Sequence, residues 1–375
     1  MRIASVEVIP YALPFREPYV TAAGTLDRRE MALLRLRSDD GLVGLGEAVP
    51  LSLRGATGFA QVVTELEGLA ERDRLDEALL ASGATGLSPP ARCAALTALL
   101  DLRGKRAAVE GMAGQEAPPP VRCNATLVAG DPAAVVSAAE RWAADGFSTF
   151  KLKLGAETAK TRVEPGFLRS RDVEMVRGVR EALGSRVRIR VDANGAWDVE
   201  TAKRTLGELE PYEVELAEQP VATLEEAMEV ARSTSIPLAA DESIESRADA
   251  ERAAAMEACQ MTGIKLSKVG GPEAAIEIAE VLPAYISSAL DGPVGIAAAA
   301  QVAATLAEAP DGGNSDPASA SGERVALAHG LATQRLFAST VASVECELRG
   351  DMLHPPSGPG LGVEIDEAAL DAHRL

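Results

Sequence analysis

Residues that bind transition metals or form disulfide bonds are scarce in this sequence. Its 375 residues include four cysteines and three histidines. The cysteines are far apart and lack the C-x-x-C spacing of a zinc or redox motif, so neither a disulfide framework nor a zinc site is expected. The histidines all lie near the C-terminal end, from His329 onward, which argues against a metal site built on imidazole groups.

Long apolar runs, a signal-peptide pattern and a dinucleotide motif are also missing. No apolar run reaches the roughly 18 residues that span a bilayer. The N-terminal residues alternate like a strand, without the charged-then-apolar order of a signal peptide. No G-x-G-x-x-G follows a candidate strand, so nothing supports dinucleotide binding. We therefore expect a cytoplasmic protein.

Basic residues are fewer than acidic ones, 37 against 56, and the formal net charge is therefore −19. This balance argues against nucleic acid and anionic membranes as partners. It does not exclude an anionic substrate, since a bound cation can set the local field. The composition is compatible with a homo-oligomer as well as with a monomer.

The N-terminal part of the chain has the pattern of a small α+β domain. Alternating apolar residues predict an antiparallel three-stranded sheet, and the stretch between the first two strands reads as a long polar loop that could act as a lid. Two apolar-periodic helices follow, and a Pro/Gly-rich linker ends the domain. The expected strands are Ile3–Leu13, Met31–Arg37 and Leu42–Ala48; the helices are Phe59–Ala70 and Pro90–Arg106, and the linker is Gly111–Pro120.

From Val121 onward, strands alternate with helices, which is typical of a parallel α/β barrel. We expect a barrel over residues 120–337 and a capping domain over residues 1–115, which the tail at about 338–375 completes. Residues 155–172 and 311–323 read as insertions. The eight expected strands are Val121–Leu127, Thr149–Leu154, Val187–Asp192, Val214–Glu218, Pro237–Asp241, Thr262–Lys265, Tyr285–Leu290 and Val325–His329.

Charged residues end four successive strands of this barrel: Asp192, Glu218, Asp241 and Lys265. The carboxyl ends of parallel barrel strands open onto one face, so these side chains should converge. Three carboxylates without imidazole or thiolate favour Mg²⁺, with Mn²⁺ as a possible substitute. The alternative is that each carboxylate only caps the next helix, but three crowded carboxylates need a cation to offset their repulsion.

Two lysines, Lys151 and Lys153, point into the barrel from the second strand because strand alternation places them on one face. They could form structural salt bridges with the acidic cluster. Alternatively, Lys153 is a general base whose pKa is lowered by the neighbouring Lys151 and a nearby dication. Lys265 would lie across the ring from Lys153, and Lys268 is expected to be solvated.

Five motifs together carry a family resemblance. KLK at 151–153, VDANGAW, AEQP, ADES and IKLSKVGG, in this order, resemble the enolase superfamily and, within it, the muconate-lactonizing subgroup. The resemblance implies a modified (β/α)7β TIM-type barrel with an α+β N-terminal capping domain. It also implies Mg²⁺ on Asp192, Glu218 and Asp241, and proton abstraction next to the carboxylate of a small-molecule substrate by Lys153, with Lys151 beside it and Lys265 on the opposite face of the substrate.

Within the superfamily, residues 286–306 and 329–337 resemble the o-succinylbenzoate synthases, which are dehydratases of menaquinone biosynthesis. Ser287 and Ser288 could bind a substrate carboxylate together with the amides that begin the next helix, or they could only cap that helix. Dipeptide epimerases carry an Asp-x-Asp pair where this chain has Gly330–Thr333. N-succinylamino acid racemase, a related acyl-amino acid or dipeptide epimerase, and muconate cycloisomerase are the alternatives. Arg28, Arg29 and Arg54 in the expected lid segments could pair with a substrate carboxylate, but exposed arginines are usually solvated, and we expect that here.

Overall fold

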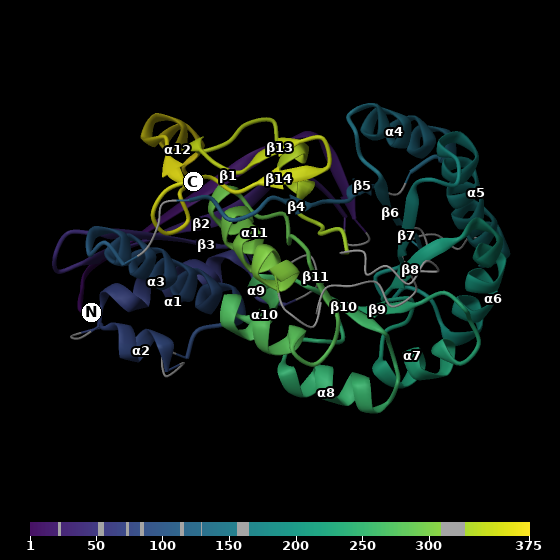
Figure 1. Ribbon diagram of the computed structural model, residues 1–375, viewed down its shortest axis with the longest axis horizontal. Coiled ribbons are helices and arrows are strands. Elements are labelled where there is room, and N and C mark those ends of the chain that lie inside the picture. Colours follow the sequence, from purple (N-terminus) through teal and green to yellow (C-terminus); the bar gives the residue numbers. More distant parts are fainter. Residues whose placement is uncertain are drawn as a thin grey trace.

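The computed structural model describes residues 1–21, 24–51, 56–72, 75–82, 86–112, 116–128, 130–155, 165–308 and 327–375. Figure 1 shows two lobes, with the N-terminal strands and helices in one and the strand–helix alternation curling through the other. The predicted insertion at 311–323, much of the one at 155–172, and Arg54 lie outside the described residues.

The N-terminal lobe is built on an antiparallel sheet with the strand order β1-β2-β3. Its strands are β1 (Ile3–Thr21), β2 (Gly24–Ser38) and β3 (Val43–Ala48), followed by the helices α1 (Phe59–Ala70), α2 (Glu77–Ala81) and α3 (Pro89–Val109). The sheet and both predicted helices are confirmed. The predicted long loop is wrong: β1 and β2 continue as a hairpin whose pairing reaches Thr21 and Gly24. Tyr19 and Val20 supply β-forming residues inside that polar stretch.

Helix α3 packs closely against β3 because two glycines remove side chains from the contact. A Cβ at Gly44 or Gly46 would collide with the carbonyl oxygens of Ala98 and Ala94, respectively. Apolar residues of α1, α3 and the sheet form a core of their own beneath this contact. The capping lobe therefore presents the other side of its sheet to the barrel.

The second lobe is a curled parallel sheet with helices outside it (Figure 1). Seven described strands pair in sequence order, and they are β5 (Ala125–Leu127), β6 (Thr149–Lys153), β7 (Arg188–Asp192), β8 (Val214–Glu218), β9 (Leu238–Ala240), β10 (Met261–Ile264) and β11 (Ala284–Ile286). The helices are α4 (Pro132–Ala144), α5 (Pro165–Leu183), α6 (Val199–Leu209), α7 (Leu224–Ala231), α8 (Arg247–Ala255), α9 (Leu266–Val269), α10 (Pro272–Ala279) and α11 (Pro293–Glu308). Short 3₁₀ turns lie at Glu210–Tyr212 and Ala332–Leu336.

The two edges of this sheet are joined by a short segment around His329. His329 forms a parallel bridge with Cys123, and Gly330 forms one with Ser287 at the end of β11. The Asn124 N–H donates to the His329 carbonyl at 2.9 Å, and the Gly330 N–H donates to the Ile286 carbonyl at 2.8 Å. The fold is therefore a modified TIM barrel with a capping domain. Of the predicted eighth strand, residues 325–326 lie outside the described residues.

The C-terminal tail returns to the capping lobe, as the yellow segments beside β1 in Figure 1 show. Strand β4 (Val121–Arg122) pairs with β14 rather than with the barrel, in a small sheet ordered β13-β14-β4. The Leu375 N–H donates to the Pro10 carbonyl at 3.0 Å. The tail elements are β12 (Ala342–Val344), β13 (Glu347–Arg349), β14 (Met352–His354), β15 (Glu364–Ile365) and α12 (Glu367–His373). The division at residues 115–120 stays a prediction.

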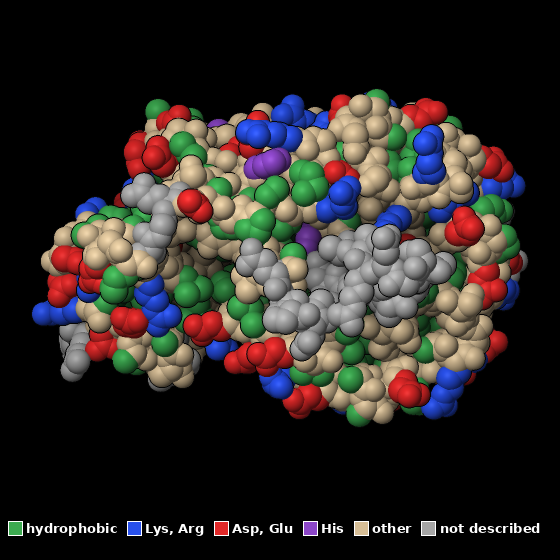
Figure 2. Space-filling view, in the orientation of Figure 1, with side chains coloured by type: hydrophobic (Ala, Val, Ile, Leu, Met, Phe, Trp, Pro, Cys, Tyr) green, Lys and Arg blue, Asp and Glu red, His purple; other side chains and the backbone are tan. Residues whose placement is uncertain are grey.

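The surface carries both signs of charge. Figure 2 shows Lys and Arg side chains interspersed with Asp and Glu over the described part of one face. Among the described residues, no helix is both long enough and apolar enough to cross a membrane.

Candidate active site

Backbone register sets the predicted strand-end residues side by side. In the parallel ladder Lys153 of β6 pairs with Asp192 of β7, and Asp192 pairs with Glu218 of β8. Glu218 in turn pairs with Ala239, so Asp241 lies just beyond the end of β9. The three carboxylates are fully or almost fully buried. Equal strand-end positions in the sequence therefore become neighbouring positions in space.

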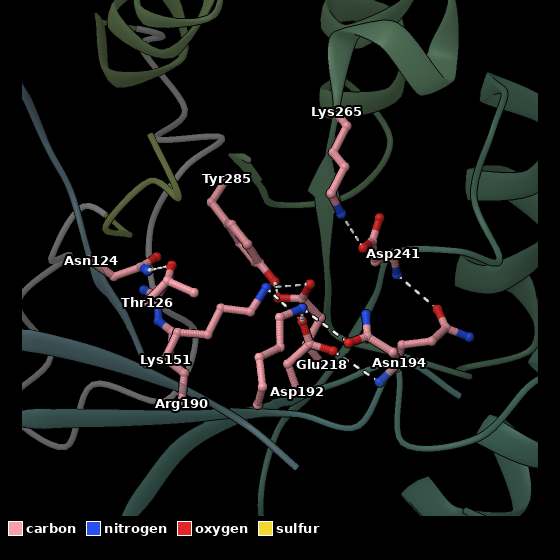
Figure 3. Close-up of polar contacts among 12 residues, drawn as sticks. Asn124, Thr126, Lys151, Arg190, Asp192, Asn194, Glu218, Asp241, Lys265 and Tyr285 are labelled. Atoms are coloured by element: carbon pink, nitrogen blue, oxygen red, sulfur yellow. Dashed lines mark hydrogen bonds and ion pairs between the residues drawn. The ribbon is translucent and has the colours of Figure 1, made fainter. Parts of the chain in front are cut away.

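Lys151 joins two of the carboxylates. Its Nζ lies 2.8 Å from Asp192 Oδ2 and 2.6 Å from Glu218 Oε1. Figure 3 shows the Lys151 ammonium and the Tyr285 ring both directed at Glu218, with Asp192 alongside. Burial alone would lower the pKa of Lys151, but Asp192 and Glu218 outweigh it and raise that pKa. Burial and the charge of Asp192 raise the pKa of Glu218, while burial is outweighed at Asp192, whose pKa the lysines lower.

Lys153 is the more open of the two lysines on β6, with 23% of its side chain exposed against 5% for Lys151. Its Nζ lies 2.5 Å from Asp192 Oδ2 and 3.0 Å from Asn194 Oδ1. Burial and the charge of Lys151 lower the pKa of Lys153, but Asp192 outweighs them and the net pKa is raised. The predicted effect of Lys151 thus has the right sign, and the net lowering, which is predicted for a site with a dication nearby, stays a prediction. The salt-bridge alternative describes these contacts correctly.

Asp241 faces two lysines from the segment after β10. Lys265 forms an ion pair with Asp241 Oδ2, and Lys268 Nζ lies 3.0 Å from Asp241 Oδ1 and also donates to its carbonyl. Lys268 is 2% exposed, so the prediction that it is solvated is wrong. The reason is the short helix α9, which begins at Leu266 and turns Lys268 back toward Asp241.

A buried polar layer lies beneath these groups, and the motif analysis did not single out its members. The Tyr285 hydroxyl donates to Glu218 Oε2, and the Arg190 guanidinium lies 5.1 Å from the centre of the Tyr285 ring. Arg190 also pairs with Glu215 and donates to the Ala328 carbonyl at 2.6 Å. Strand alternation was a usable signal for Arg190, because it lies two residues before Asp192 on the same face.

Two residues in the loops after the strands also hold Asp192 and Asp241 in place. Gln219 Oε1 accepts from the Asp241 N–H at 2.8 Å, and its Nε2 donates to Ser243 Oγ at 2.5 Å. The Asn194 N–H donates to Asp192 Oδ1 at 2.9 Å, with Asn194 in the left-handed region at φ 48°. Asparagine tolerates that conformation better than most residues, which fits its place in the tight DANG turn.

The two predicted substrate-binding serines follow β11. The Ser287 N–H donates to the Ile264 carbonyl at 2.7 Å, and its side chain lies against Gly330. The Ser288 hydroxyl donates to Asp291 Oδ2 at 2.6 Å and accepts from the Leu290 N–H at 3.0 Å. Ser288 thus makes turn-capping contacts, in line with the capping alternative. Binding of a substrate carboxylate by either serine stays a prediction.

Two family models match the chain, one over each lobe. Residues 3–110 match the mandelate racemase/muconate lactonizing enzyme N-terminal domain, and residues 134–369 match the enolase C-terminal domain-like family. The second match alone spans more than half of the chain. The protein belongs to the enolase superfamily. It is therefore an enzyme of the lyase and epimerase type found among these proteins.

Individual relatives in this superfamily have different activities. An o-succinylbenzoate synthase from Thermobifida fusca (strain YX) is 41% identical over 58% of this chain and 62% of its own length. A muconate lactonizing enzyme from Pseudomonas fluorescens, solved with muconolactone, is 27% identical, covers 100% of this chain and 99% of its own, and has a TM-score of 0.85. A dipeptide epimerase from Cytophaga hutchinsonii, solved with Mg and D-Ala-L-Val, is 24% identical, covers 99% and 98%, and has a TM-score of 0.82.

Enolase-superfamily enzymes bind Mg²⁺, and the donor set here fits that ion chemically. Asp192, Glu218 and Asp241 offer hard carboxylate oxygens on adjacent strands. Within the described ranges, however, no three His, Cys, Asp or Glu side chains are gathered so as to hold a metal ion. Lysine ammonium groups contact the carboxylates instead. The predicted convergence therefore takes the form of a lysine–carboxylate network, and the metal site stays a prediction.

Arg29 is placed differently from the sequence-based expectation. It is 4% exposed and donates to the Pro50 carbonyl at 2.6 Å and the Ala289 carbonyl at 3.1 Å. The prediction that it is solvated is wrong, because β2 continues through this position and carries the side chain into the contact with the barrel. Arg28 is exposed, as predicted, and pairs with Glu30.

Proposed function

We propose that the protein is a Mg²⁺-dependent o-succinylbenzoate synthase, a dehydratase of menaquinone biosynthesis. The observation that carries the proposal is the placement of two lysines on either side of the carboxylate strands. Lys153 ends β6 and Lys265 follows β10, with β7, β8 and β9 between them in the sheet order. Lys153 could thus remove and donate a proton at one face of a bound substrate, while Lys265 keeps its positive charge at the other face.

The charge of the site favours an anionic substrate. Four lysine ammonium groups contact three carboxylates in this network. Bound Mg²⁺ would add positive charge, so a substrate with carboxylate groups would be attracted. When bound by Asp192, Glu218 and Asp241, Mg²⁺ would stabilise negative charge on the substrate carboxylate as a Lewis acid.

The lysines would divide the proton chemistry between them. Asp192 raises the pKa of Lys153, and a cation bound to Asp192 would offset that effect and favour the neutral amine. Lys153 Nζ would then remove the proton next to the substrate carboxylate and donate it to the leaving hydroxyl on the same face. Lys265 Nζ remains protonated across the ring and stabilises the negative charge that develops. Lys151 stays charged, because Asp192 and Glu218 raise its pKa, and it holds those two carboxylates in position.

An amino-group substrate has less support in this chain. Resemblance to the dipeptide epimerases would require acidic side chains at Gly330–Thr333, and this segment has none. Leu331 and Ala332 are buried there, and Gly330 pairs with Ser287. A substrate ammonium group would therefore find no carboxylate in this segment. Racemisation of N-succinylamino acids is the nearer alternative, since their amine is acylated and carries no charge.

Substrate comparison tests this proposal. We expect purified protein with Mg²⁺ to dehydrate the cyclohexadiene carboxylate substrate of o-succinylbenzoate synthases with a kcat/KM at least tenfold above that for N-succinylamino acids, dipeptides or muconate. Dehydration is followed by ultraviolet absorbance and the other reactions by polarimetry. Higher kcat/KM for a dipeptide or for muconate would show that the chain has a different activity.

A further inference from the structure

The loop between β11 and α11 is held by a carboxyl group from the capping lobe. Glu47, near the end of β3, accepts the Gly292 N–H at 2.6 Å and the Val294 N–H at 3.3 Å. Tyr11 of β1 donates its hydroxyl to the same carboxyl group at 2.8 Å. Glu47 is 3% exposed and takes no part in the proton chemistry described above. The Glu47 carboxyl group thus accepts hydrogen bonds from N–H groups at the start of α11.

A second residue of the cap holds the same loop from another strand. The buried Arg29 of β2 donates to the Ala289 carbonyl and also to the Pro50 carbonyl, just after β3. The loop itself contains Leu290 with φ 69°, a left-handed conformation that leucine adopts only at a cost in free energy. The cap therefore contacts this loop both before and after its strained residue.

The closeness of this contact depends on two glycines. A Cβ at Gly292 would lie 2.5 Å from the Tyr11 hydroxyl and 2.7 Å from Glu47 Oε2, and a Cβ at Gly295 would lie 2.9 Å from Glu47 Oε1. Real Cβ atoms do not approach other atoms so closely. The segment DGPVG at 291–295 is thus shaped to receive Glu47.

We propose that Glu47 and Arg29 are positioning residues, through which the cap fixes the conformation of the loop that carries Ser287 and Ser288 at the barrel mouth. The hydrogen bonds to Gly292, Val294 and Ala289 leave this loop little freedom. The consequence for substrate binding rests on the proposed function, in which the loop contacts the end of the substrate that does not react. Loss of the hydrogen bonds that hold the loop should therefore raise KM more than it lowers kcat.

The charges around Glu47 add a pH dependence. Burial, and then the neighbouring Asp291, raise the pKa of Glu47 to about 7. The Tyr11 hydroxyl and the Cys93 thiol also face it, and Arg29 faces Asp291. The pKa of Glu47 in the folded protein lies above its usual value of 4.5. The stability that Glu47 contributes to this loop is therefore fully present below pH 4.5. This contribution of Glu47 to the stability of the loop is lost as the pH rises through about 7.

Hydrogen exchange of the full-length protein tests the proposal without requiring activity. We compare wild type with Glu47→Ala and Glu47→Gln, and follow peptides that cover residues 288–296 by mass spectrometry. Glu47→Ala should speed exchange there by about tenfold or more, since two amides lose a buried acceptor. Glu47→Gln should stay closer to wild type than Glu47→Ala, because its single amide oxygen can still accept from the Gly292 N–H, which makes the shorter of the two bonds. Glu65→Ala is the matched control, as Glu65 accepts the Ser88 N–H at 2.8 Å within the cap.

The pH profile and the kinetics complete the test. After correction for intrinsic rates, exchange in wild type should rise between pH 5 and 8, while Glu47→Gln should show no such rise. With whichever substrate is turned over, Glu47→Ala should raise KM about tenfold with a smaller change in kcat, and Glu47→Gln should raise KM less than Glu47→Ala does. Unchanged exchange in Glu47→Ala, or, if that variant does not fold, the same pH dependence in wild type and Glu47→Gln, would overturn the positioning role. Failure of the substrate comparison alone would leave the exchange result standing.

Discussion

Replacing Lys153 by alanine should reduce kcat by a factor of about 10² to 10⁴, the range over which a positioned general base contributes. The structure predicts a folded variant, since Asp192 keeps its contacts with Lys151 and with the Asn194 N–H. The measurement is steady-state turnover at saturating Mg²⁺, with circular dichroism to confirm the fold. Mg²⁺ affinity should change far less than kcat, because Lys153 supplies no oxygen ligand.

Lys203→Ala is the matched control for this variant. Lys203 lies on α6, where it pairs with Glu200 and Glu229 on the outside of the barrel. Loss of this exposed ion pair should leave kcat within about twofold of wild type. Near-wild-type turnover in Lys153→Ala would show that another group takes the proton.

Exchanging Glu218 for glutamine should remove Mg²⁺ binding and activity together. The carboxylate is central in the network, between Asp192 on β7 and Asp241 after β9. Wild type should gain about 2.7 kcal/mol of stability when Mg²⁺ is present at a hundred times its Kd. The variant should gain almost none. Calorimetric titration and thermal unfolding, each with and without Mg²⁺, measure the two effects.

The fold of Glu218→Gln should survive, and this separates a metal defect from unfolding. Burial and Asp192 raise the pKa of Glu218, so its negative charge is disfavoured among these neighbours. Glutamine keeps the shape without that charge. Glu225→Gln, on the exposed face of α7 beside Arg252, is the control. Equal Mg²⁺-induced stabilisation of Glu218→Gln and wild type would remove this residue from the metal site.

Much of the fold could be predicted because local patterns and the fold agree. Strand ends at Asp192, Glu218 and Asp241 recur at the spacing of a βα unit, and the structure places them on adjacent strands. Lys151 and Lys153 point inward as alternation requires, while Phe150 and Leu152 are buried among apolar groups. Periodicity carries this information because burial of one face decides which way each side chain points.

Other features depend on contacts between distant segments, which spacing does not encode. The sequence predicts that Lys268 is solvated, but helix α9 directs its side chain toward Asp241. The sequence predicts that Arg29 is solvated, yet its hydrogen-bond partners are the carbonyl groups of Pro50 and Ala289. No sequence pattern marks Glu47, because its partners Gly292 and Val294 lie in the other lobe, far along the chain. The ion pairing of the lysines with the carboxylates likewise follows from the three-dimensional placement of the charges.

The measurement that tests the proposed activity most directly is α-deuterium incorporation. Each enantiomer of an N-succinylamino acid is incubated in D₂O with Mg²⁺ and the protein, and exchange is followed by NMR beside dehydration of the cyclohexadiene substrate. A dehydratase that moves protons only with Lys153 should dehydrate rapidly and racemise N-succinylamino acids weakly or not at all, because Lys153 reaches only one face of the substrate. Fast exchange from both enantiomers, at rates that match or exceed dehydration, would contradict the account and show that Lys265 also transfers protons.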